Sequence, residues 1–171
     1  MKGLGAVDRL PIQFRTELDA SDPDAVRALV LSTGFFSPEE VAVAVELVQE
    51  RLGKGEASGY RFLFAERGGL MLGYTCFGLI PLTRSSHDLY WIVVHPHSQG
   101  AGLGRQLLAM TERAIATAGG TVVYAETSSR PQYEPTRAFY LKCGYRIAAE
   151  IADFYAPGDG KVVFEKRLTP Q

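Results

Sequence analysis

The sequence predicts an α/β protein in which helices cover a single mixed sheet. Two observations carry this prediction. Strand and helix patterns alternate along most of the chain, and their order is β-α-α-β-β-β-α-β-α-β-β. The 171 residues are 46% hydrophobic and 22% charged, which is typical of a globular protein. No linker or repeat interrupts the pattern, so residues 1–171 are predicted to form one domain.

The N-terminal third is predicted to hold one strand and two helices. Residues 12–15 alternate between apolar and polar side chains, as a short strand does. Ser21 is the expected N-cap of the first helix, because a proline follows two residues later. Ser37 and Glu40 have capping-box spacing at the start of the second helix, which Gly53 and Gly55 are expected to end.

Strand patterns dominate the middle of the chain. Residues 60–65 and 70–79 flank the turn pair Gly68-Gly69, which predicts a hairpin. Residues 89–94 are almost entirely apolar, which predicts a central strand buried on both faces. The remaining expected elements are a helix at 103–118, a strand at 121–127, a helix at 135–142 closed by Gly144, and paired strands at 146–154 and 162–168.

Charge and composition argue against several classes of function. The net charge is −1 and the basic residues are scattered, so neither nucleic acid nor a membrane surface is an expected partner. No apolar run is long enough to span a bilayer, and no signal peptide is apparent. With only two cysteines, in different segments, a reduced cytoplasmic protein is expected. Cys76 and Cys143 form no CxxC pair, and the three histidines do not form a metal-ligand set. No metal is therefore expected.

A glycine-rich loop is the sharpest functional signal. Residues 94–105 run from the apolar strand directly into an amphipathic helix and contain Gly100, Gly102 and Gly104. The N-terminus of a helix attracts phosphate, and glycines let an anion approach the backbone N–H groups. The loop is interpreted as a diphosphate-binding cradle, the alternative being a simple turn. Its spacing fits neither a Walker loop nor a dinucleotide-binding fingerprint.

This loop resembles the signature of the GCN5-related N-acetyltransferase (GNAT) superfamily, (Gln/Arg)-x-x-Gly-x-(Gly/Ala), at Gln99, Gly102 and Gly104. A second segment, residues 133–145, is similar to the family's closing motif, Asn-x-x-Ala-x-x-Phe-Tyr-x-x-x-Gly-Phe. Phe139, Tyr140, Gly144 and Tyr145 match its strongest positions, whereas Tyr133 replaces the usual Asn and Thr136 the usual Ala. The element order is also that of the family, so the resemblance covers most of the chain.

The resemblance implies a GNAT-like acyl-CoA N-acyltransferase fold and acetyl-CoA as co-substrate. It implies that strand backbone groups hold the pantetheine arm, and that the Val94 amide polarises the thioester carbonyl. The cofactor-binding residues that it implies are Ile92, Val93, Val94, Gln99, Gly100, Ala101, Gly102, Leu103, Gly104, Arg105, Thr136 and Phe139.

Two catalytic residues are predicted. By resemblance Tyr140 is the acid that protonates the leaving thiolate, the alternative being an aromatic residue packed on its helix. Glu126 lies in an otherwise apolar strand, where a carboxylate is either a general base or half of a structural ion pair. A covalent route through Cys143 is the weaker alternative, because no neighbouring residue in the sequence lowers the pKa of its thiol.

The resemblance places the acceptor site at Phe35, Phe36 and Tyr155. The alternative for Phe35 and Phe36 is a hydrophobic staple at a helix start. The expected acceptor is a small-molecule amine, with amino acids among the candidates. A peptide or protein N-terminus and a non-catalytic acyl-CoA-sensing module are the alternatives. Family members often dimerise, so the resemblance also allows a homodimer.

Overall fold

The computed structural model describes residues 10–169. Its order of strands and α-helices confirms the predicted β-α-α-β-β-β-α-β-α-β-β. The elements are β1 (Gln13–Arg15), α2 (Asp22–Ser32), α3 (Pro38–Lys54), β2 (Arg61–Arg67), β3 (Leu70–Leu79), β4 (Ser86–Val94), α4 (Leu103–Thr117), β5 (Val122–Ser128), α5 (Glu134–Lys142), β6 (Arg146–Ala156) and β7 (Asp159–Arg167). Three short 3-10 helices were not predicted: η1 (Gly55–Ser58), η2 (Pro96–Ser98) and η3 (Pro131–Tyr133).

The strands of the described chain form one hydrogen-bonded sheet in the order β1-β2-β3-β4-β5-β7-β6. The predicted mixed α/β sheet is therefore confirmed. Contacts divide the chain into two compact units, and both β4 and α4 contribute to each. Of the described residues, the first unit comprises 10–78 together with Trp91–Thr111, and the second comprises Leu79–Tyr90 together with 112–169. No described helix is long and apolar enough to cross a membrane.

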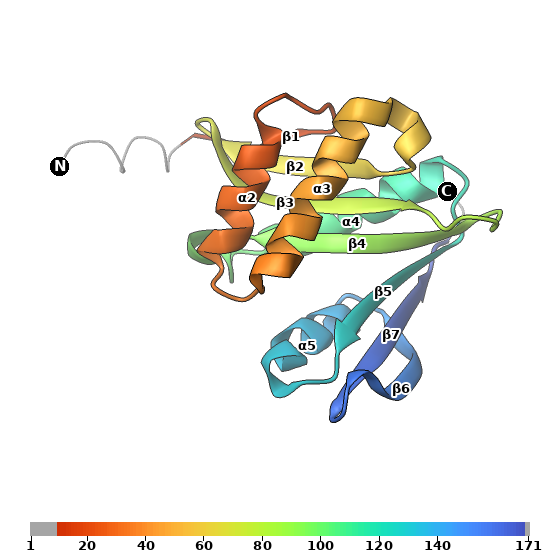
Figure 1. Ribbon diagram of the computed structural model, residues 1–171. Coiled ribbons are helices and arrows are strands. Elements are labelled where there is room, and N and C mark those ends of the chain that lie inside the picture. The colour runs from red at the N-terminus through yellow and green to blue at the C-terminus, as the bar shows by residue number, and fades with distance from the viewer. Residues whose placement is uncertain (1–9, 170–171) are drawn as a thin grey trace. The chain divides into compact units, whose positions relative to one another are not determined.

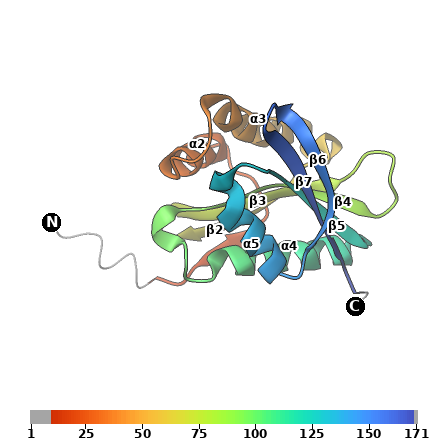
Figure 2. The same ribbon diagram turned by 90° about the horizontal axis from the view of Figure 1, so that it is seen from below.

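In the first unit, helices lie on both faces of the strands (Figure 1; Figure 2). Helices α2 and α3 cover one face, and the N-terminal part of α4 lies on the other. The hydrophobic core under α2 and α3 is built from Val26, Leu29, Val30, Val41, Ala44, Val48, Phe62, Phe64, Met71, Tyr74, Cys76 and Val93. In each helix, the apolar residues that recur every three or four positions form the face that is buried.

The two predicted helix starts have different outcomes. The capping box of α3 is confirmed: the Ser37 hydroxyl accepts the Glu40 N–H, and the Glu40 carboxylate accepts the Ser37 N–H. Ser21 occupies the N-cap position of α2, as predicted, but its side chain makes no capping hydrogen bond and its backbone angles are already helical. The carboxylate of Asp22 instead accepts the N–H of Asp19 at 2.7 Å. Helix α3 ends at Lys54 with Gly55 as its C-cap, so Gly55 is confirmed as a stop residue whereas Gly53 lies within the helix.

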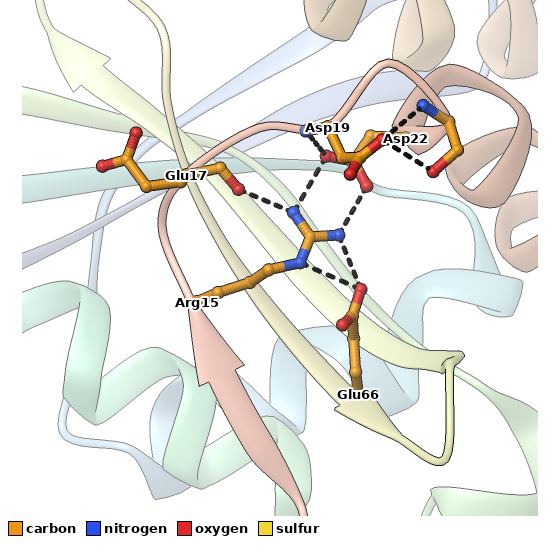
Figure 3. Close-up of polar contacts among 6 residues, drawn as sticks. Arg15, Glu17, Asp19, Asp22 and Glu66 are labelled. Carbon is orange, nitrogen blue, oxygen red and sulfur yellow. Dashed lines mark hydrogen bonds and ion pairs between the residues drawn. The ribbon is translucent and has the colours of Figure 1, made fainter.

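A polar cluster centred on Arg15 joins β1 to β2 and to the start of α2 (Figure 3). The guanidinium donates to both carboxylate oxygens of Asp22, at 2.5 and 2.9 Å, and to Glu66 at 2.6 Å. It also lies over the ring of Phe64, 4.4 Å from the centroid. The Asp22 side chain is only 1% exposed, so Arg15 supplies the charge that makes its burial tolerable.

In the second unit, β4 begins parallel to β5, and the antiparallel β7 joins β5 to the edge strand β6. Helix α5 packs on this sheet through Tyr140, whose ring centroid is 5.3 Å from that of Phe164 on β7. Lys166 of β7 donates to Glu112 of α4 at 2.7 Å, on the same face as Phe164. All eleven residues of β6 are exposed.

The prediction that residues 89–94 form a strand buried on both faces is wrong in its burial. The strand is longer, starting at Ser86, and Tyr90 is 37% exposed while Trp91, Ile92 and Val94 are half-buried. Within the second unit its parallel pairing with β5 comprises Ser86–Asp88 against Val122–Tyr124. A run of apolar residues shows that a strand is hydrophobic, but each face of the strand is buried only where another element covers that face.

Candidate functional site

The glycine-rich loop joins the end of β4 to the start of α4, as predicted. Gly100 and Gly102 have φ angles of +78° and +85°, and an added Cβ would meet no heavy atom within 4 Å at either position. Both glycines are therefore needed for backbone conformation, and the space beside them is open. Gly104 lies in the first turn of α4 instead.

Side-chain and backbone hydrogen bonds shape this loop. The Gln99 side-chain amide donates to the Val94 carbonyl at 3.0 Å, and the His95 N–H donates to Leu72 on β3 at 2.8 Å. The backbone N–H of Gln99 donates to the Pro96 carbonyl at 3.3 Å. Gln99 thus ties the loop to the strand, and the N–H groups of the first turn of α4 have no partner within the helix. These N–H groups are suited to an anion.

The other predicted cofactor residues differ in exposure. Val93 and Leu103 are only 4% and 3% exposed, so these residues can contact a ligand only through their backbone. The half-buried members of the set are Ile92, Val94, Gly104, Thr136 and Phe139, and the exposed members are Gln99, Gly100, Ala101, Gly102 and Arg105. Exposure is thus concentrated in the loop itself.

The two phenylalanines predicted to line the acceptor site lie against β4. Phe36 packs on Trp91 with ring centroids 5.0 Å apart, and Phe35 makes an edge contact with Phe36 at 5.1 Å. Both Phe36 and Trp91 pack against the core of the first unit. This arrangement favours the packing interpretation for Phe36 and leaves Phe35, which is half-buried, as the better acceptor candidate. Sequence reasoning did not single out Trp91.

Tyr140 is held in an aromatic cluster within the second unit. It is 4% exposed, and its ring lies 5.4 Å from Tyr145 and 5.6 Å from Phe139. Burial, and then the nearby Cys143, raise the pKa of the Tyr140 phenol above its usual value. The phenol therefore keeps its proton throughout the physiological range, as a hydrogen-bond donor must.

Glu126 is paired and partly exposed rather than buried. Its carboxylate lies 2.7 Å from the Lys161 ammonium, and its side chain is 47% exposed while that of Lys161 is 15% exposed. The ion pair that was the alternative to a catalytic role is therefore present, and it does not by itself exclude that role.

Asp88 on β4 is a candidate that sequence reasoning missed. Burial and the negative charge of Glu126 raise its pKa to about 6, whereas Lys161 acts in the opposite direction. Its backbone pairs with Tyr124, two residues before Glu126 on β5. A carboxylate whose pKa lies near physiological pH is suited to proton transfer. The available signal was the one used for Glu126, a carboxylate in an apolar strand, but the strand was expected to start after Asp88.

Tyr155, the third predicted acceptor residue, lies near Lys161, the ion-pair partner of Glu126. Lys161 lies 3.9 Å from the Phe154 ring centroid and 5.9 Å from that of Tyr155, and the two rings meet edge to face at 4.9 Å. The structure thus groups Asp88, Glu126, Lys161, Phe154 and Tyr155, which we call the Lys161 cluster. All five belong to the second unit.

Among residues 10–169, no group of three or more His, Cys, Asp or Glu side chains is placed to hold a metal ion. His95 and His97 stack with centroids 5.3 Å apart, and the His95 Nδ1 accepts the His97 N–H at 3.3 Å. This contact shapes η2 before the glycine loop.

Comparison with known proteins agrees with the order of elements and with the loop. Residues 58–147 match the model of the acetyltransferase (GNAT) domain. A GNAT-family acetyltransferase structure from Desulfovibrio desulfuricans is 44% identical, has a TM-score of 0.92, and aligns over 93% of this chain and 100% of its own. The PaiA N-acetyltransferase of Thermoplasma acidophilum, solved with coenzyme A, shares the fold at 17% identity with a TM-score of 0.71, covering 93% of this chain and 100% of its own.

A curated relative, the mycothiol acetyltransferase of Streptomyces bingchenggensis, is 29% identical over 122 residues. The match covers 70% of this chain but spans only 39% of that protein's length. The family match covers more than half of the present chain and includes the glycine loop and α5. The chain therefore belongs to the GNAT family of acetyltransferases.

Proposed function

We propose that this protein transfers an acetyl group from acetyl-CoA directly to the primary amine of a small molecule. The observation that carries the proposal is the β4–α4 loop, where two left-handed glycines leave open space beside the start of a helix. In this proposal the loop from Gln99 to Arg105 binds the diphosphate of CoA, and the backbone of Ile92–Val94 holds the pantetheine arm. Relatives of the same fold that were solved with coenzyme A support it.

The proposed reaction forms one bond and breaks one. The amine nitrogen attacks the thioester carbonyl carbon, the C–S bond breaks, and the products are an amide and the free thiol of CoA. One proton leaves the amine nitrogen and one reaches the sulfur, so one group must accept a proton and another must donate a proton to the thiolate. An acceptor that binds as an ammonium first releases one further proton to solvent.

Asp88 is the proposed proton acceptor, with Glu126 as its neighbour. Burial, and then the negative charge of Glu126, raise the pKa of Asp88 to about 6, so Asp88 is mostly ionised at neutral pH yet basic enough to accept a proton. Glu126 remains a candidate base in its own right, acting through water. Tyr140 is the proposed donor to the thiolate, and burial keeps its phenol protonated.

The proposed acceptor is a small-molecule amine; Phe35 in the first unit and Tyr155 in the second stay the predicted acceptor residues. The curated relative named mycothiol acetyltransferase supports a small acceptor, and amino acids are among the candidates. We propose that the reaction takes place in the cytoplasm, in keeping with free cysteines at positions 76 and 143.

The deciding experiment measures thiol release from acetyl-CoA across an acceptor panel. The panel holds both enantiomers of several amino acids, simple amines, polyamines, aminoglycosides and short peptides. Turnover with a small amine would support the proposal, whereas turnover confined to peptides would indicate a peptide N-terminal acetyltransferase. Acetyl-CoA binding without turnover of any acceptor would contradict the proposal and favour an acyl-CoA-sensing module.

A further inference from the structure

The Lys161 cluster contains a cation in an unusual position for a protein that acetylates amines. The Lys161 side chain is 15% exposed, and its ammonium lies between the Glu126 carboxylate and the face of the Phe154 ring. An amine acceptor is a cation before it loses its proton, and a fixed positive charge repels it. A lysine at this place therefore needs a reason beyond charge balance.

A bulge in β6 holds the aromatic side of the cluster in place. The register of β6 against β7 runs from Ile151↔Lys161 to Ala156↔Asp159, so four residues of β6 lie opposite Gly160 alone. Asp153 within the bulge has a φ of +53°, and its carboxylate accepts the Gly158 N–H at 2.6 Å. Aspartate is among the non-glycine residues that adopt a positive φ most readily, because its short side chain bonds to nearby backbone, so this contact fixes the bulge. The bulge carries Phe154 and Tyr155 toward Lys161.

The partner of Lys161 is one that a ligand can replace. The Glu126 side chain is 47% exposed, and an ion pair with an exposed partner contributes little net free energy. An ammonium has three donors, so a second carboxylate can bind beside Glu126 or in its place. The neighbouring Asp88 supplies the opposite charge, because its ionised carboxylate attracts an ammonium group.

We propose that Lys161 binds the carboxylate of the acceptor, and that the acceptor is therefore an amino acid or a related amine with a carboxylate close to the reacting nitrogen. This inference rests on the proposed function and narrows its substrate class. The acceptor ammonium lies toward Asp88 and its carboxylate toward Lys161, while Phe154 and Tyr155 contact its apolar part. Polyamines and aminoglycosides are disfavoured, because their additional positive charges would meet Lys161.

The test compares matched acceptors that differ only in the carboxylate. Alanine and phenylalanine are each measured against their carboxamides and against the corresponding amines that lack the carboxylate. In the wild-type protein, kcat/KM for each amino acid should exceed that of its carboxamide by about tenfold or more, since charged hydrogen bonds are the stronger ones. Lys161→Gln should abolish this preference by raising KM for the amino acids.

The ratio of the two acceptors isolates the proposed contact. Lys161→Gln also raises the pKa of Asp88, but this change affects both acceptors alike and cancels in the ratio. Lys161→Arg should retain the preference, and Lys54→Gln, which removes an exposed lysine of α3, should leave it unchanged. If Lys161→Gln does not fold, the proposal is judged by the preference for amino acids over carboxamides in the wild-type protein and in Lys161→Arg.

The two proposals fail in different ways. Equal rates for amino acids and carboxamides in the wild-type protein, or a preference that survives Lys161→Gln, would overturn the role of Lys161 while leaving amine acetylation intact. Acetylation of none of these acceptors would overturn the amino-acid proposal, and silence across the whole acceptor panel would overturn both.

Discussion

Asp88 and Glu126 illustrate how a single contact changes the chemistry of a side chain. Both are carboxylates in apolar strand sequences, yet burial and the charge of Glu126 raise the pKa of Asp88 to about 6, while Glu126 is ion-paired with Lys161. If Asp88 is the base, it works only when ionised, so activity must fall as the pH falls through its pKa.

We therefore expect kcat/KM to decrease below about pH 6, the pKa that burial and Glu126 give Asp88. Glu126→Gln removes a neighbouring negative charge, so it should lower the pKa of Asp88 and move this decrease to lower pH. Asp88→Asn should reduce kcat by about 10²-fold or more. A pH–rate profile of each variant checks the assignment, and an Asp88→Asn protein with full activity would transfer the role to Glu126.

The aromatic cluster of α5 supports a second prediction at the scale of a residue. Tyr140→Phe keeps the ring that packs on Phe164 and removes the donor to the thiolate, so kcat should fall by about 10²-fold with CoA affinity nearly unchanged. Tyr145→Phe is the matched control, because Tyr145 packs on the ring of Tyr140. Single-turnover kinetics and CoA binding would separate the two effects, and equal losses in both variants would indicate a packing role.

At the scale of elements, β3 approaches β4 and α4 closely at Gly73. A Cβ at this position would lie 2.8 Å from the Val93 carbonyl oxygen and 2.9 Å from Leu107 Cδ1. The Val93 carbonyl belongs to the backbone and cannot move aside cheaply. Gly73 is therefore required for the packing of the strand that is proposed to hold the pantetheine arm.

Gly73→Ala should lower the free energy of unfolding by about 1–3 kcal/mol through overpacking. Gly53→Ala is the control in α3, where an added Cβ meets nothing within 4 Å. This control should raise the free energy of unfolding by up to about 1 kcal/mol, because alanine favours helix. Urea denaturation measures both, and a neutral Gly73→Ala would mean that β4 shifts readily.

The Arg15 cluster connects β1 and β2 to α2, so its loss should lower the free energy of unfolding (Figure 3). Arg15→Met leaves the buried carboxylate of Asp22 unpaired and should cost about 2 kcal/mol, less than for a fully buried pair because Arg15 is 28% exposed. Glu66→Gln removes a partner that is 27% exposed and should cost less than about 1 kcal/mol. Chemical denaturation, with Arg15→Met/Asp22→Asn completing a double-mutant cycle, measures the coupling.

At the scale of the whole molecule, binding of a ligand should raise the free energy of unfolding. If the glycine loop binds CoA, acetyl-CoA at about 100 times its Kd should add about 2.7 kcal/mol to the free energy of unfolding. Gly102→Ala should remove most of this gain, since a Cβ would enter the open space beside the loop. Gly119→Ala, at the other end of α4, is a matched control with a φ of +87° and equally open surroundings.

Both glycine variants should lose similar stability without ligand, because both place alanine in the left-handed region. Differential scanning calorimetry with and without acetyl-CoA checks the difference. Equal ligand-induced shifts in the two variants would argue that the loop does not bind the cofactor.

The sequence by itself determined the order of elements, the hairpin between β2 and β3, the capping box of α3 and the glycine loop. These features arise from interactions between near neighbours in the chain, such as periodic apolar faces, side chains that cap a helix end, and glycines at positive φ. The family resemblance followed from the same local motifs. The assigned roles of Tyr140 and Glu126 stay predictions.

Only the tertiary structure decided which distant residues meet. It placed Asp88 beside Glu126 and Lys161, Phe36 on Trp91, and Arg15 between Asp22 and Glu66. It also showed that the apolar run of β4 is not buried on both faces. Such contacts depend on strand register and on which element covers each face. A linear pattern does not encode those pairings residue by residue, because they result from the packing of the chain as a whole.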